Sequence, residues 1–384
     1  MSEDKKTPLY DEHVALGAAM TGFGGWLMPL RYTSDLAEHR AVRESAGLFD
    51  LSHMGEIEVT GPEAAAALDH ALVGSATAIA VGRAKYSMIC AEDGSVLDDL
   101  IVYRLAEERF LIVANAGNAE LVARELFTRA EGFGVVVADR SDAAALIAVQ
   151  GPEAAGIVSA IVADDDVETV RELKYYAATP TTLQVGAGIR ALVARTGYTG
   201  EDGFELFVAA EDAAALWRAL LERFGGADGL LVPAGLSARD SLRLEAGMPL
   251  YGHELDTTTT PYEAGLGRVV RLDKVDDAGQ PIPFVGRAAL AARKASPPPR
   301  VLVGLRGQGR RPARAGYDVV LPRKDRKIGV VTSGSPSPTL GYPIAMAYVT
   351  PEFSAEGTEL AVDVRGREEP FVVVPLPFYR RPQS

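Results

Sequence analysis

The sequence predicts an α+β protein with two α/β lobes built on antiparallel sheets, followed by a small all-β domain. Three observations lead to this prediction. A strand-to-helix pattern occurs twice before residue 160, strands joined by short turns lie between the two copies, and helical periodicity ends after a proline-rich stretch near residue 297. Short strand–turn–strand connections indicate antiparallel pairing, so a doubly wound parallel sheet is not expected.

Composition excludes several functional classes. The 384 residues include 39 Lys and Arg against 52 Asp and Glu, a formal net charge of −13. This argues against nucleic-acid binding, because affinity for DNA or RNA rests on neutralising phosphates. The longest apolar run, Ala143–Val149, is too short to cross a membrane. The single cysteine, Cys90, cannot form an intrachain disulfide, and the charged N-terminus lacks an apolar signal, which predicts a cytoplasmic protein.

The first predicted helix begins at Thr33-Ser34-Asp35, residue types that cap helix N-termini. Glu38 stands three residues after Asp35, as a capping box requires, and the helix is expected to end near Gly47. The next predicted element is a strand from about Ser52 to Thr60.

In this strand, apolar and acidic residues alternate. Ile57 and Val59 are expected to face a core, whereas Glu56 and Glu58 are expected to face outward. His53 is separated from Ile57 and Val59 by an even number of positions, so it should lie on the same face of the strand. We therefore expect a core histidine held by hydrogen bonds. The five histidines include no H-x-x-x-H pair, and no metal site is predicted.

A seven-residue repeat suggests two α/β units of similar topology. Val59-Thr60-Gly61-Pro62-Glu63-Ala64-Ala65 recurs as Val149-Gln150-Gly151-Pro152-Glu153-Ala154-Ala155. In both copies a strand ends, Gly permits a sharp turn, Pro is expected at the first helical position, and Glu meets the positive end of the helix.

Between the copies, three strands are expected over Tyr86–Cys90, Val96–Arg104 and Phe110–Ala114. The Asp93-Gly94 step is a strong hairpin signal, and a second turn is expected around residues 106–108. No Gly-rich nucleotide-binding pattern such as G-x-G-x-x-G occurs in the sequence.

The stretch 294–300 contains three consecutive prolines and is expected to be a stiff linker. It divides the chain into a region of two α/β lobes, 1–290, and a C-terminal β-barrel or sandwich, 300–384. The expected strands of this domain include Val301–Leu305, Ile328–Val331, Ala345–Val349 and Phe371–Val374.

Asp98 and Asp99 are adjacent carboxylates on one predicted strand. Successive side chains point to opposite faces, so the two cannot share a proton as a catalytic dyad does. Asp99 lies on the face of Leu97, Ile101 and Tyr103, which predicts partial desolvation and a role as an acid or base. The alternative is a turn-proximal Asp that binds backbone amides.

The segment Arg195–Leu206 carries glycines at 197, 200 and 203, which suit a close backbone approach. On the strand that follows, Phe204 and Leu206 share one face and leave Glu205 on the other. A carboxylate there can accept two parallel hydrogen bonds from a ligand edge. The alternative is an ordinary hairpin with a solvated Glu205.

A helix is expected over residues 234–245. It places Arg239 and Arg243 on one face, with Asp240 able to pair with Arg243. Such charges usually form a solvated face, but one of the arginines could instead orient Glu205 or a ligand oxygen.

Together these segments resemble the aminomethyltransferase, or T-protein, family of the glycine cleavage system. The resemblance runs from Thr7-Pro8-Leu9 to Pro377-Phe378-Tyr379. Its anchors are residues 24–30, 50–56, 97–100, 195–206, 238–240, 332–334 and 337–340. It implies a three-lobed fold in which two α/β lobes and a C-terminal β-barrel surround a folate. It also implies transfer of an aminomethyl group from the lipoyl arm of H-protein to tetrahydrofolate, alongside the P-protein and L-protein.

The resemblance also assigns roles to residues. Asp99 matches the aspartate that faces the reacting nitrogens of the pterin, and Glu205 matches the residue that accepts hydrogen bonds from the ring edge. The remaining matches are folate-lining positions: Met54, Tyr86, Asn115, Tyr198, Arg239 and, from the barrel, Tyr379. Tetrahydrofolate is expected as co-substrate, with no metal and no flavin. The loop 275–283 is longer than the family pattern suggests.

Two other functions fit the sequence less well. Related folate-dependent demethylases are in some cases fused to flavin domains, and the chain contains no flavin-binding segment. A folate-binding accessory protein would carry a cysteine-containing motif at Arg195–Glu205, where this sequence has none.

The charge is distributed unevenly along the chain. From Arg300 onward there are 13 basic and 8 acidic residues, whereas the preceding residues have 26 basic and 44 acidic. The basic residues close together in the C-terminal domain are Arg310, Arg311, Arg314, Arg323, Lys324, Arg326 and Lys327. We expect this domain to attract an acidic H-protein or the polyglutamate tail of folate.

Overall fold

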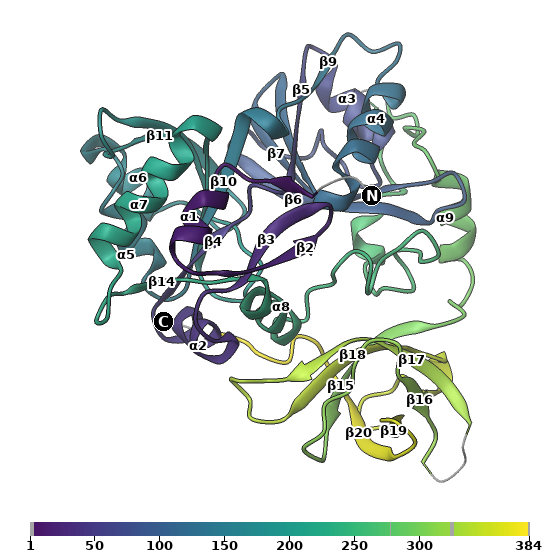
Figure 1. Cartoon of the computed structure of the whole chain (residues 1–384). Helices are drawn as coiled ribbons and strands as arrows, with labels where there is room; N and C mark the ends of the chain where they lie inside the picture. The colour runs from purple at the N-terminus through teal and green to yellow at the C-terminus, as the bar shows by residue number, and fades with distance from the viewer. Residues whose placement is uncertain (1–3, 277, 323–325, 383–384) are drawn as a thin grey trace.

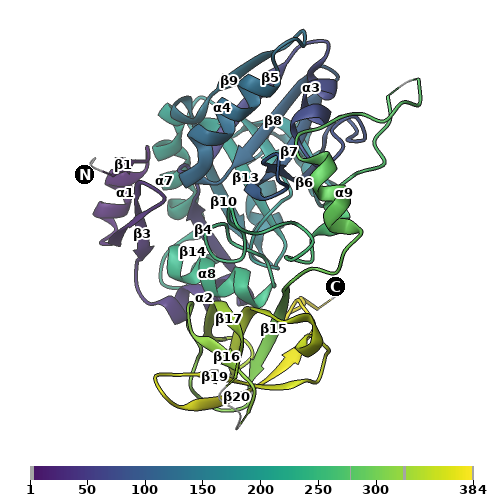
Figure 2. The same cartoon turned by 90° about the vertical axis from the view of Figure 1, so that its right-hand side faces the viewer.

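The computed structural model describes residues 4–276, 278–322 and 326–382. Two α/β lobes lie side by side above a C-terminal barrel, and helices α2 (Asp35–Glu44) and α8 (Leu236–Glu245) lie next to the barrel in both views (Figures 1 and 2). Among these residues, no helix has the length and apolar character needed to span a bilayer.

The first lobe contains a five-stranded sheet in the order β6-β7-β8-β5-β9. Its strands are β5 (Gly55–Thr60), β6 (Arg83–Cys90), β7 (Val96–Ala106), β8 (Arg109–Ala114) and β9 (Val136–Asp139). All neighbours pair antiparallel, as predicted for the hairpins. Helices α3 (Ala64–Ala71) and α4 (Ala119–Arg129) contribute to the apolar core on one face of the sheet.

The second lobe contains a six-stranded sheet in the order β11-β12-β13-β10-β4-β14. Its strands are β4 (Ala46–Asp50), β10 (Ala144–Gln150), β11 (Ala178–Leu183), β12 (Ile189–Ala194), β13 (Gly203–Ala209) and β14 (Leu231–Pro233). Its core is completed by α5 (Ala154–Ser159), α6 (Val167–Arg171) and α7 (Ala213–Phe224). Helix α1 (Tyr10–Ala15) adjoins a small sheet of β1 (Lys5–Lys6), β2 (Ala19–Phe23) and β3 (Trp26–Arg31).

The repeated heptapeptide has the same local structure in both lobes. Gly61 and Gly151 adopt φ values of 134° and 137°, and a Cβ at either position would meet a backbone carbonyl oxygen. In each copy the helix begins at the first alanine, so the proline lies in the turn and not at the first helical position as expected. The repeat therefore marks equivalent strand-to-helix turns.

Two local predictions need correction. Ser34 caps α2 by accepting from the Ala37 amide at 3.1 Å, but Glu38 does not complete a capping box. Its carboxylate accepts from the amides of Tyr32 and Thr33, each at 2.8 Å, and from that of Gly235 at 2.9 Å. Glu38 therefore ties the start of α2 to the start of α8, a contact between segments that are distant in sequence.

Glu56 is the second correction, because it is 5% exposed and does not face outward. It pairs in register with Val113, which belongs to a core between the two sheets. Burial, followed by the charges of Asp139 and Glu205, raises the pKa of Glu56 to about 8. The second lobe covers the face of the strand that the alternating pattern assigned to solvent.

After α9 (Arg287–Lys294), residues 295–300 contain no helix or strand, and a closed six-stranded barrel follows. Its strands are β15 (Val301–Gly307), β16 (Asp318–Val320), β17 (Lys327–Pro336), β18 (Pro343–Val349), β19 (Glu359–Asp363) and β20 (Glu368–Val374). Leu244 of α8 packs against Ile344 and Met346, which fixes the barrel beneath the lobes.

Several basic residues of the barrel are paired with carboxylates. Arg311 lies 3.4 Å from Glu369, Arg326 lies 3.8 Å from Glu352, and Lys327 lies 2.7 Å from Asp318. Arg323 and Lys324 lie outside the described residues, as does Asp277 of the 275–283 loop. Because these pairs neutralise part of the basic surface, they weaken its expected attraction for an acidic partner.

Candidate functional site

A cavity of about 440 Å³ lies where the two sheets and the residues after α8 meet. Seven of the eight site residues predicted from the sequence line it: Met54, Tyr86, Asp99, Asn115, Tyr198, Glu205 and Arg239. They come from positions spread over 186 residue numbers and from both lobes, so only the tertiary fold assembles them. A cavity of this size with few polar groups suits a small organic ligand.

Asp99 on β7 is held in a fixed orientation. Its Oδ2 accepts from the Tyr86 hydroxyl at 2.9 Å, and its Oδ1 accepts from the Asn115 amide at 2.9 Å. Burial raises the pKa of Asp99 to about 6, against the lowering effect of these two hydrogen bonds. A carboxyl group with such a pKa can give or take a proton near neutral pH.

Asp98 points to the opposite face of β7, as the alternation predicts. It is fully buried and accepts from Asn118 Nδ2 at 2.7 Å and from the Asn115 backbone amide at 3.0 Å. Burial and the charge of Asp99 raise the pKa of Asp98 to about 7. The Asn115 side chain also donates to Asp98 at 3.0 Å and so connects the two carboxylates without placing them in one pocket.

Glu205 lies on β13 at another wall of the cavity. Phe204 and Leu206 face the core of the second lobe, which leaves Glu205 on the cavity side, as expected. Its Oε2 accepts from the Tyr103 hydroxyl at 3.3 Å and from the Thr196 hydroxyl. Burial raises its pKa.

Two of the glycines before β13 leave room for the side chain of Gln150. A Cβ at Gly197 or Gly203 would collide with the side chain of Gln150, which accepts from Thr199 and donates to the Thr196 carbonyl. The close approach expected from the glycines therefore packs the loop around Gln150 and brings Tyr198 to the cavity wall.

Tyr198 and Arg239 lie together on this wall. The Arg239 guanidinium stands 4.7 Å from the centre of the Tyr198 ring, and the Tyr198 hydroxyl donates to the carbonyl of Pro249. Arg243 points elsewhere, and at 1% exposed it is not part of a solvated face. It binds Asp240 at 2.7 Å, Glu254 at 2.8 Å and, in the barrel, Ser333 at 2.7 Å.

Tyr379 is the predicted site residue that does not line the cavity. Its ring covers the guanidinium of Arg43 on α2 at 4.0 Å, and its amide donates to the Glu245 carbonyl at 2.8 Å. The chain after β20 runs back along the end of α8, which carries Tyr379 there. Tyr379 therefore lies beside Gly200 in the loop that carries Tyr198, and its contact with folate stays a prediction.

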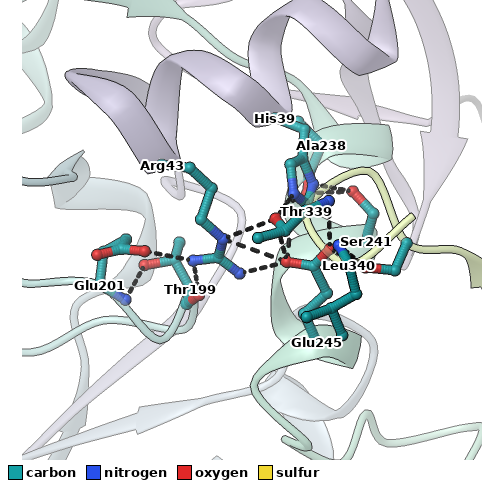
Figure 3. A network of polar contacts seen from close by, with 10 residues as sticks. His39, Arg43, Thr199, Glu201, Ala238, Ser241, Glu245, Thr339 and Leu340 are labelled. Carbon is teal, nitrogen blue, oxygen red and sulfur yellow. Dashed lines mark hydrogen bonds and ion pairs between the residues drawn. The ribbon is translucent and has the colours of Figure 1, made fainter. Parts of the chain in front are cut away.

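Arg43 is the centre of a buried polar network shown in Figure 3. Its guanidinium donates to the Thr199 carbonyl at 2.7 Å, to Glu201 at 2.8 Å and to Glu245 at 2.7 Å. Glu245 also accepts from Thr339 of the barrel at 2.7 Å. The network thus joins the loop that carries Tyr198, the helix that carries Arg239, and the barrel.

Comparison with known proteins gives the family. The GCVT N-terminal domain matches residues 9–274, and the glycine cleavage T-protein C-terminal barrel domain matches residues 300–380. The chain belongs to the glycine cleavage T-protein family.

Its relatives in this family include the aminomethyltransferases of Streptomyces avermitilis, 60% identical over 98% of both chains, and of Saccharopolyspora erythraea, 56% identical over 99% of this chain and 100% of the other. A solved structure, the glycine cleavage system aminomethyltransferase T from Bartonella henselae, superposes with a TM-score of 0.86 at 39% identity and covers 98% of both chains. The three-lobed T-protein fold implied by the resemblance is confirmed.

Several cavity residues were not predicted from the sequence. Thr196 and Tyr103, which bind Glu205, line the cavity together with Phe23, Tyr176 and His53. Tyr103 shares strand parity with Asp99, a signal that could have identified it. His53 is buried, as expected of a core histidine, but it lies in a turn before β5 and not on a strand.

Proposed function

We propose that this chain transfers the aminomethyl carbon from the lipoyl arm of H-protein to tetrahydrofolate. The products are 5,10-methylenetetrahydrofolate, ammonia and the dihydrolipoyl protein. The observation that carries the proposal is one cavity with two differently held carboxylates, Asp99 bound by Tyr86 and Asn115, and Glu205 bound by Thr196 and Tyr103. A relative named aminomethyltransferase that is 60% identical over 98% of this chain supports it.

The cavity fits a reduced folate chemically. A 2-amino-4-oxo pyrimidine edge presents two adjacent N–H donors, which one carboxylate can accept in parallel, and Glu205 supplies such a carboxylate. Tyr198 and Arg239 stand at the same wall. Met54 and Tyr86 offer apolar surface to a flat ring.

Asp99 is assigned to proton movement at the reacting nitrogens of the folate. In the reaction two N–C bonds form on the folate, while the C–S bond of the lipoyl arm and the C–N bond of the aminomethyl group break. The two protons lost by the folate nitrogens end on the sulfur and on the departing amine. Because Tyr86 and Asn115 fix both oxygens of Asp99, the carboxylate is oriented before substrate arrives.

The working partners follow from this proposal. Lipoylated H-protein delivers the one-carbon unit, and the P-protein and L-protein are expected to load and reoxidise its arm. We place the enzyme in the cytoplasm, where these reactions supply one-carbon units from glycine.

The direct test combines the protein with tetrahydrofolate and aminomethyl-loaded H-protein. Ammonia and methylenetetrahydrofolate should appear in equal amounts and far above the rate without enzyme. Omission of tetrahydrofolate should abolish the formation of methylenetetrahydrofolate. Release of both products at the uncatalysed rate would contradict the proposed function.

A further inference from the structure

Three histidines are buried in this protein, and they differ in how their rings are bound. His13, fully buried, bonds Asp50 through Nε2 at 2.9 Å and Tyr32 through Nδ1 at 2.8 Å. His39, also fully buried, bonds Ser241 through Nδ1 at 2.7 Å and Thr339 through Nε2 at 2.8 Å. His53 is 2% exposed, yet neither ring nitrogen has a hydrogen-bond partner among the residues that the structure describes.

A buried polar group without a partner costs free energy of folding, and such groups in native proteins are few. An apolar side chain would remove this cost. The charge of Asp50 acts on His53 but does not relieve this cost, because the Asp50 carboxylate is already bound by Thr7 at 2.7 Å, by His13 and by the Ser52 amide at 2.8 Å. The unused hydrogen-bonding capacity of His53 therefore calls for a functional explanation.

The two nitrogens of His53 are in different positions. Nδ1 is sealed inside the protein without a partner. Nε2 also has no partner, but it is not sealed inside the protein. The open space that His53 borders is the cavity. In the cavity wall, the His53 ring meets the Phe23 ring edge-on, with the ring centres 5.7 Å apart. A buried unpaired acceptor is tolerated better than a buried unpaired N–H, so the proton belongs on Nε2.

We propose that His53 is a ligand-binding residue whose Nε2–H donates to the 4-oxo oxygen of the bound folate ring. This inference rests on the proposed function. Arg239 lines the same cavity, and its positive charge acts on His53, so a ligand atom that both side chains contact should be rich in electrons. In a folate ring the 4-oxo oxygen is adjacent to the N–H group assigned to Glu205. His53 and Arg239 then recognise the acceptor, and Glu205 recognises the donors.

Burial lowers the pKa of His53 to about 4, so the ring stays neutral at physiological pH. A neutral donor recognises a carbonyl without adding a second positive charge beside Arg239. We therefore expect this contact to favour pterins that carry an oxygen at position 4 over analogues that lack it.

The test compares His53→Leu with the matched variant His13→Leu. Leucine at 53 removes an unsatisfied group, so the melting temperature of the ligand-free protein should rise while tetrahydrofolate binds about tenfold more weakly. Leucine at 13 removes one of the partners of Asp50 and the ring nitrogen that binds the Tyr32 hydroxyl, so the melting temperature should fall. His53→Gln, whose amide N–H can reach about as far as Nε2, should restore affinity to within about threefold of wild type.

Wild-type affinity in a folded His53→Leu protein would overturn the proposal. If that variant does not fold, the proposal is tested on the wild type through the imidazole nitrogen resonances of His53. Tetrahydrofolate should shift the Nε2 resonance. An unchanged Nε2 resonance in the saturated complex would overturn the proposal. If the wild type itself does not bind tetrahydrofolate, the proposed function fails, an outcome distinguishable from the failure of the His53 assignment.

Discussion

The hydroxyl of Tyr86 donates a 2.9 Å hydrogen bond to Oδ2 of Asp99. This bond stabilises the ionised carboxylate, whereas burial, the larger effect, favours the neutral acid, and the pKa of Asp99 settles at about 6. Tyr86 thus contributes to the acid–base behaviour of Asp99 as well as to the cavity wall.

Replacing Tyr86 by Phe removes this bond and should raise the pKa of Asp99. If Asp99 must be ionised to accept a proton, kcat/KM rises with pH through the pKa of the free enzyme, so its midpoint should move from near 6 to a higher pH. The measurement is kcat/KM for tetrahydrofolate between pH 5 and 9. As a control, Tyr262→Phe removes a buried hydroxyl with no partner among the described residues and should leave the midpoint in place. If the midpoint of Tyr86→Phe does not move, the hydrogen bond between Tyr86 and Asp99 has no role in the acid–base step.

Replacing Glu205 by Ala should weaken tetrahydrofolate binding. Charge-assisted hydrogen bonds contribute about 1.5–3 kcal/mol, which corresponds to roughly 10- to 150-fold in Kd. The loss should be measured by calorimetry at fixed pH, with folding verified from the melting temperature. Binding as tight as in the wild type would mean that Glu205 does not contact the ring edge.

Arg43→Lys should weaken the binding of tetrahydrofolate without slowing the chemical step. Lysine keeps the charge but cannot reach Thr199, Glu201 and Glu245 together, so the loop with Tyr198 and the helix with Arg239 lose their common support. Asp99, in the other lobe, is untouched. We expect KM for tetrahydrofolate to rise by about tenfold while kcat changes by less than about twofold.

The matched control is Arg40→Lys, on the same helix and exposed. It should leave both constants at wild-type values. A parallel fall of kcat in Arg43→Lys, or equal effects of the two variants, would contradict a positioning role for Arg43.

Residues whose environment is set by their own strand could be predicted from the sequence. The opposite orientations of Asp98 and Asp99, the placement of Glu205 away from Phe204 and Leu206, and the equivalent turns at the two repeat copies all follow from local periodicity. The family resemblance added the roles, because spacing alone named no ligand.

Residues whose environment comes from a distant segment could not be predicted in this way. Glu56 is covered by the second lobe, Glu38 binds Gly235 across almost 200 residues, and Tyr379 rests on Arg43. His53 was assigned to a strand that begins only at Gly55. For Glu38 and Glu56 the local pattern identifies the right element, and a distant segment supplies the partner that the pattern cannot show. For His53 the pattern places the start of the strand too early.

The central claim is that Asp99 moves the proton in a cavity that binds tetrahydrofolate. Asp99→Asn tests it most directly, through single-turnover ammonia release from aminomethyl-loaded H-protein at saturating tetrahydrofolate. The rate of Asp99→Asn should be at least about tenfold below that of the wild type, with the Kd for tetrahydrofolate unchanged within about threefold. Ammonia release at the wild-type rate by Asp99→Asn would contradict it.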